Sequence, residues 1–142
     1  MFNFLKRRRA AANPEPDVPG ASTASQIIFL QLPFCDLDPI SLCAKLGNDE
    51  FALGYVFGVA DMANYQLNSA SAGDQGAALD YIRYVFVETQ GGGGEERFAQ
   101  ALQCQSSSTF SQGRQAGADD LGGWLQTKGQ RYAMGLSRHF SE

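Results

Sequence analysis

Apolar positions recur at intervals of three and four residues along most of the chain, and this spacing predicts helices. Segments with this spacing lie at residues 38–46, 49–67, 75–90, 109–126 and 128–140, and a further short helix is expected to begin at Glu95. The apolar run 26–34 is too short to distinguish a strand from a helix, so we expect an extended or helical arm packed on the core. Strand propensity leaves a strand as the alternative for 81–89. The pattern predicts an all-α fold, a compact bundle of five or six helices.

Short polar residues mark where these helices begin. Asp38 precedes Pro39, a pair typical of an N-cap followed by the first helical position. Asn48 or Asp49, Asp74 and the segment 106–109 occupy the same place before the next apolar stretches. Their side-chain oxygens are suited to accept hydrogen bonds from the free amides of a helix start.

One pattern occurs twice, 59 positions apart. It joins an aromatic residue, two glycines, an aspartate, an apolar residue and a second aromatic residue at helical spacing. The first copy is Phe51, Gly54, Gly58, Asp61, Met62 and Tyr65, and the second is Phe110, Gly113, Gly117, Asp120, Leu121 and Trp124. Each set falls on one face of a helix. The match predicts an internal duplication of a helical unit, with coincidence as the alternative.

The glycines of this pattern predict two helices that approach closely. Glycine in a helix interior costs about 1 kcal/mol relative to alanine, so four matched glycines indicate a packing reason. Asp61 and Asp120 share the glycine faces. If they met, one pKa would rise or a divalent cation would bind. The simpler interpretation, which we adopt, gives each carboxylate its own structural partner, a helix end, a hydroxyl, an indole or an arginine.

Composition places a basic tail before an acidic body. Residues 1–25 are rich in Ala, Pro, Ser and Gly, and we expect a disordered tail followed by a single domain at 26–142. The chain has 11 lysines and arginines against 15 acidic residues, and four of the bases lie within residues 6–9. An acidic body argues against nucleic acid as a partner.

The sequence offers no recognisable catalytic or metal-binding motif. Cys35, Cys43 and Cys104 form no C-x-x-C pair, and with the single His139 they make a poor zinc site. The glycine run 91–94 lacks the Gly-Lys-Ser/Thr of a phosphate loop. We therefore expect no catalytic residue, no bound metal and no cofactor. Unpaired cysteines favour a reducing, cytoplasmic location.

The first nine residues form a small amphiphile. Its apolar members are Phe2, Phe4 and Leu5, and its bases are Lys6, Arg7, Arg8 and Arg9. At about 1 kcal/mol per base, such a segment predicts weak, reversible contact with an anionic membrane surface, with a solvated basic tail as the alternative. The longest uncharged apolar run, 51–60, is shorter than the ~20 residues of a membrane span.

These patterns favour a small non-catalytic helical protein, an adaptor or regulatory module that acts by contact with another protein. Two alternatives stay open. One is a peripheral protein held at the inner membrane surface by the basic-aromatic N-terminus. The other is a small enzyme or ligand binder that uses Asp61 and Asp120. The interface candidates are the aromatic residues, glycines and aspartates of the repeated pattern. Neither the identity of the protein partner nor the oligomeric state follows from these patterns.

Overall fold

The computed structural model describes residues 18–69 and 73–141. Its helices are α1 (Ala21–Gln31), α2 (Pro39–Leu46), α3 (Glu50–Leu67), α4 (Gln75–Gln90), α5 (Gly94–Gln103), α6 (Ser108–Gln126) and α7 (Gly135–Ser141), joined in part by the 3-10 turns η1 (Leu32–Cys35) and η3 (Gly91–Gly93). No strand occurs in the described residues, so the all-α class is confirmed and the strand alternative for 81–89 is wrong. The expectation for residues 1–17 lies outside the described part of the chain.

The four helix starts marked by short polar residues are capped as predicted. Each capping side chain accepts a hydrogen bond from an amide three residues later. The pairs are Asp38 with Ser41, Asp49 with Ala52, Asp74 with Ala77, and Ser107 with Phe110, at 2.8, 3.0, 3.0 and 3.2 Å. Such caps stabilise a helix start by about 1 kcal/mol each.

The folded domain begins earlier than residue 26, which corrects the expected boundary. α1 starts at Ala21, and both Ala21 and Ala24 are buried. The hydroxyl of Tyr81 also donates to the carbonyl oxygen of Pro19 at 2.7 Å. Small residues dominate 18–25 in the sequence and gave a tail-like composition, but here their small size allows α1 to lie close to the core.

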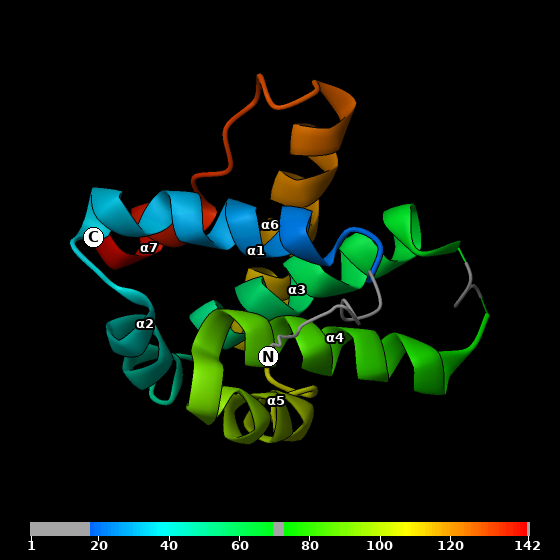
Figure 1. The fold of residues 1–142 in the computed structure, drawn as a ribbon. Coiled ribbons are helices and arrows are strands. Elements are labelled where there is room, and N and C mark those ends of the chain that lie inside the picture. The colour runs from blue at the N-terminus through cyan, green and yellow to red at the C-terminus, as the bar shows by residue number, and fades with distance from the viewer. Residues whose placement is uncertain (1–17, 70–72, 142) are drawn as a thin grey trace, which may run out of the picture.

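The last helix is shorter than predicted. α7 starts at Gly135 instead of residue 128, because Lys128 and Gly129 adopt positive φ angles of 54° and 86° and end the helical path after α6. Leu136 is fully buried, whereas Tyr132 lies outside the helix and is 73% exposed. The segment 127–134 is therefore a surface loop that returns from α6 to α7 (Figure 1).

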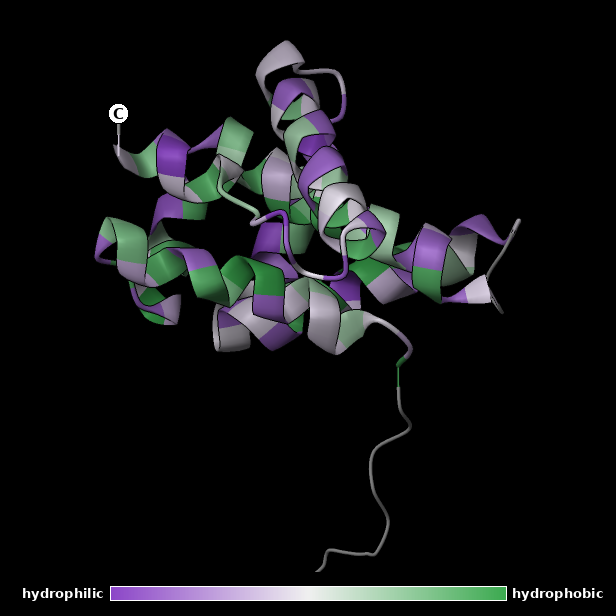
Figure 2. Ribbon diagram, turned by 90° about the horizontal axis from the view of Figure 1, so that it is seen from above, coloured by the Kyte–Doolittle hydropathy of each residue, from purple (hydrophilic) through white to green (hydrophobic). Residues whose placement is uncertain are grey.

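α3 is the central helix, and the others pack around it (Figure 1). α1 and α7 lie together on one side, and α4 and α5 lie together on another, while α6 crosses α3. Residues 52–60 of α3 are all buried, as its apolar character on every side predicts. Hydrophobic and hydrophilic residues are interleaved along the other ribbons in Figure 2, which gives those helices one face for the core and one for solvent.

Candidate functional site

The two copies of the repeated pattern pack directly on each other. Gly54 and Gly58 of α3 lie against the backbone of α6, where an added Cβ would collide with the carbonyl oxygens of Phe110 and Arg114 respectively. Only glycine fits at such a contact, because the opposing atoms are backbone and do not move aside. The glycine face of α3 is thus a close helix-to-helix crossing.

The α6 glycines make the reciprocal contacts. Cβ atoms added at Gly113 and Gly117 would collide with the carbonyl oxygens of Phe51 and Tyr55. Residues 51 and 55 become 110 and 114 on adding 59, so each glycine of one copy meets the same pattern position of the other copy. The residue numbers of the contacting pairs rise together along the two helices, since Gly54 meets Phe110 and Gly58 meets Arg114. α3 and α6 therefore run parallel at the crossing. This is the arrangement that small-x3-small pairs give in close helix pairs.

Asp61 and Asp120 have separate partners across this crossing. Asp61 Oδ2 lies 2.8 Å from Nη2 of Arg114, and these two side chains are 37% and 42% exposed. Asp120 Oδ2 accepts hydrogen bonds from the Tyr55 hydroxyl at 2.6 Å and from the Gly135 amide at 2.9 Å. Tyr55 and Arg114 occupy equivalent positions of the repeat. Each aspartate therefore bonds the equivalent residue of the other helix, and neither carboxylate needs a metal or a shared proton to satisfy it.

Gln31 joins the Asp120 contact into a buried network at the start of α7. Its Nε2 donates to the Tyr55 hydroxyl oxygen at 2.9 Å, and its Oε1 accepts from the amides of Leu136 and Ser137 at 2.9 and 3.1 Å. Burial, followed by the neighbouring carboxylate, raises the pKa of Tyr55 well above its usual value. The network satisfies the first amides of α7 and fixes that helix on α1 and α3. Sequence reasoning missed Gln31, whose only signal is a polar residue at the end of an apolar run.

The aromatic residues of the pattern lie in different surroundings. Phe110 is buried, with its ring centroid 5.6 Å from that of Phe57. Phe51 stacks on the imidazole of His139 at 4.4 Å, and His139 Nε2 lies 2.7 Å from Asp49 Oδ2. Tyr65 is 79% exposed and Trp124 is half-buried. The crossing thus uses the glycines and the first aromatic position, whereas at the last position Tyr65 faces solvent and Trp124 packs partly against the core.

In the described part of the chain, reactive and metal-binding side chains lie apart from one another. Within residues 18–69 and 73–141, no group of three or more His, Cys, Asp or Glu side chains is placed to hold a metal ion. The three thiols are free, and burial raises the pKa of Cys35 and of Cys104, with smaller contributions from Asp36 and Glu50. A raised pKa lowers the thiolate fraction that nucleophilic chemistry requires. The membrane-surface candidates in residues 2–9 lie outside the described residues.

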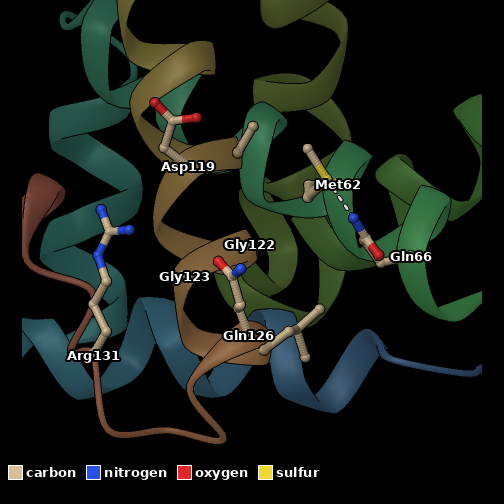
Figure 3. Close-up of a pocket in the computed structure, with 9 residues that line it drawn as sticks. Met62, Gln66, Asp119, Gly122, Gly123, Gln126 and Arg131 are labelled. Atoms are coloured by element: carbon tan, nitrogen blue, oxygen red, sulfur yellow. Dashed lines mark hydrogen bonds between the residues drawn. The ribbon is translucent and has the colours of Figure 1, made fainter.

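Two concave surfaces flank the C-terminal half of α6. The first is an open, polar groove between α6 and the end of α3 (Figure 3). Its lining residues are Met62, Gln66, Ala118, Asp119, Gly122, Gly123, Leu125, Gln126 and Arg131. Gln66 donates to the Met62 sulfur and Asp119 accepts from Gln115, so part of its polar lining is already bonded within the protein. The groove is open and carries one acidic and one basic side chain, Asp119 and Arg131. It therefore has no single charge by which it could select a ligand.

The second surface, here called the apolar pocket, is formed by Ile27, Leu30, Phe34, Trp124, Tyr132, Ala133 and Met134. Its volume is about 230 Å³, and none of these lining residues is charged. Ile27 is fully buried, whereas Leu30, Phe34 and Tyr132 are 48%, 68% and 73% exposed. It is therefore a small hydrophobic depression whose rim consists of large apolar side chains exposed to solvent.

The apolar pocket is assembled from three distant parts of the chain. α1 and η1 supply one wall, Trp124 of α6 supplies another, and the surface loop 127–134 closes it. The loop turns back beside α6, where the Gly129 amide donates to the carbonyl oxygen of Trp124 at 2.8 Å, and a Cβ added at Gly129 would lie 3.4 Å from the Trp124 ring. In the described part of the chain, no single helix has the length and apolar composition of a membrane span; only the bent pair Ala21–Cys35 and Pro39–Leu46, taken together, meets that test.

No protein-family model, curated protein or solved structure matches this chain.

Proposed function

We propose that this protein is a non-catalytic helical module that acts by binding a segment of another protein at the apolar pocket. The observation that carries the proposal is the exposure of Leu30, Phe34 and Tyr132 around one hydrophobic depression. Large apolar side chains that surround a pocket on a water-soluble surface are typical of interaction sites.

The size of the pocket favours a side chain as its occupant. Small-molecule sites usually measure about 300–1,000 Å³, whereas an apolar cavity of about 150 Å³ accepts a benzene ring. A volume of about 230 Å³ therefore suits one aromatic or branched aliphatic side chain of a partner. Filling it would bury the apolar rim, which gives roughly 25 cal/mol per Å² removed from water.

The charge of the surface around the pocket indicates which residues should flank the apolar anchor of the partner segment. The described residues contain 12 carboxylates and seven lysine or arginine side chains. Asp36 and Asp38 follow the pocket residue Phe34, are exposed and form no ion pair within the described residues. Arg131, the nearest base in sequence to Tyr132, lies against Gly123 on the side of the polar groove. We therefore expect basic residues beside the apolar anchor of the partner.

The hydrogen bonds and the ion pair of two carboxylates support the non-catalytic part of the proposal. Asp61 and Asp120, the residues on which the enzyme alternative depended, are bonded within the fold. Three free thiols support a reducing, cytoplasmic location as part of the same proposal.

The test compares capture of proteins from the native cells by tagged wild type, Phe34→Ser and Ile40→Ser. Ile40 is the matched control because it is 83% exposed, close to Phe34 in sequence and outside the pocket. We expect wild type and Ile40→Ser to capture the same one or few proteins. The captured amount of these proteins should be at least tenfold lower with Phe34→Ser. Equal capture by all three proteins, with unchanged melting temperatures, would overturn the proposal.

A further inference from the structure

We infer that the apolar pocket takes the first residues of this chain itself, Phe2 to Leu5, as an internal ligand that a partner must displace. This inference rests on the proposed function, because it names the chemistry of the segment that the pocket binds. It adds a competing occupant and therefore a means of regulation.

The composition of residues 1–9 matches what the pocket requires. Phe2, Phe4 and Leu5 supply three large apolar side chains, and Lys6–Arg9 follow them directly. An apolar anchor with basic flanks is the segment expected for an uncharged pocket on a body with excess carboxylates, among them Asp36 and Asp38 beside Phe34. A phenyl ring also fits the pocket volume of about 230 Å³.

The chain is long enough for the segment to reach the pocket. The described structure begins at Val18, just before α1, and the pocket lies at the last turns of α1 and at η1. α1 has 11 residues and is about 16 Å long at 1.5 Å per residue. The 12 residues between Leu5 and Val18 span up to about 40 Å when extended, which exceeds that length. Docking within one chain also gains from a high effective concentration.

Trp124 is a built-in probe for this docking. It is the one tryptophan of the chain, and its half-buried indole lines the pocket. A docked phenyl ring would shield the indole from a neutral quencher such as acrylamide. Quenching in the full-length protein therefore reports on occupancy directly.

The experiment compares acrylamide quenching of Trp124 in full-length wild type, the Phe2→Ser/Phe4→Ser variant and an Ala11→Ser/Ala12→Ser control, whose changes lie outside the proposed ligand segment. We expect the Stern–Volmer constant to be at least twofold higher in the double phenylalanine variant, and unchanged in the control. A synthetic peptide of residues 1–9 should restore protection to that variant in a saturable way, and the same peptide with serines at 2 and 4 should not.

Three outcomes would overturn the inference. The first is equal quenching in all three proteins with no response to the peptide. The second is protection that grows with protein concentration, which would assign the segment to the pocket of another copy. The third is binding to phosphatidylglycerol vesicles by wild type but not by the double phenylalanine variant, with identical Trp124 quenching, which would make the segment a membrane contact. If any of these three outcomes is found while protein capture still depends on Phe34, the inference fails but the proposed function stands. The proposed function itself is contradicted only when wild type and Phe34→Ser capture the same proteins equally.

Discussion

Asp61 and Asp120 hold the same position in the two copies of the repeat, yet their surroundings differ. Asp61 forms a half-exposed ion pair with Arg114, and such pairs contribute about 0–1 kcal/mol. Asp120 accepts from the buried Tyr55 hydroxyl and from the first amide of α7. Hydrogen bonds to a charged group at a partly buried site are worth about 1.5–3 kcal/mol each.

We therefore predict that Asp120→Asn lowers the free energy of unfolding by about 1–3 kcal/mol, and that Asp61→Asn lowers it by less than about 1 kcal/mol. Urea denaturation at neutral pH measures both. Because each carboxylate already has partners within the protein, we expect EDTA and added divalent cations to leave both differences unchanged. A larger loss for Asp61→Asn, or a loss that depends on metal, would contradict the assignment of these carboxylates.

The buried tyrosines give the fold an alkaline limit. Burial raises the pKa of Tyr55 and of Tyr81, assisted by Asp120 and Glu88 respectively. Above about pH 10 the phenols of the unfolded chain lose their protons while these two keep theirs, so the unfolded state binds fewer protons. The stability they contribute is thus fully present below pH 10 and is lost as pH rises beyond it.

We expect the free energy of unfolding to fall between pH 9.5 and 11.5, and to fall less steeply in Tyr55→Phe than in wild type. Urea denaturation at several alkaline pH values measures the slope. Equal slopes in the two proteins would show that the Tyr55 phenol does not couple to folding.

The parallel α3–α6 crossing depends on glycine at some positions and not at others. A Cβ at Gly58 would collide with the Arg114 backbone, whereas a Cβ at Gly122 of α6 would meet no atom within 4 Å. We predict that Gly58→Ala destabilises by on the order of 1–3 kcal/mol through overpacking. Gly122→Ala should stabilise by up to about 1 kcal/mol through helix propensity.

Thermal and urea denaturation of the two alanine variants check this prediction, with each glycine serving as the control for the other. Both lie inside a helix, so the gain in helix propensity is similar and the difference reports on the crossing alone. If Gly58→Ala were as stable as Gly122→Ala, α3 and α6 would not be in close contact.

Helices could be predicted where the local pattern decides them. Asp38, Asp49, Asp74 and Ser107 act within a few residues of themselves, and the starts of α2, α3, α4 and α6 were predicted correctly. The two ends of the fold were predicted less well, since tertiary contacts decide them. Small residues at 21–25 become helical because they pack on the core, and the positive φ of Gly129 stops a helix that periodicity alone would continue.

At the scale of the whole molecule, the sequence could predict the repeated faces but not the pocket. The glycine spacing pointed to a close contact, and the reciprocal contacts of α3 and α6 are its structural counterpart. The apolar pocket instead joins α1, η1, Trp124 and the surface loop, which are about 100 positions apart at their extremes. Periodicity carries no information about such distant neighbours, so Phe34 and Tyr132 were not among the predicted site residues.

The claim that the apolar pocket is the contact surface is tested most directly by a photo-crosslinking amino acid, p-benzoylphenylalanine, placed in living cells. One variant carries it at Tyr132 on the pocket rim and the other at Tyr65, which are 73% and 79% exposed. Tyr65 lies outside the pocket and serves as the matched control. The account predicts a discrete, ultraviolet-dependent adduct of higher mass from position 132 that is absent from position 65. Discrete adducts from position 65 alone, or the same diffuse products from both positions, would contradict it.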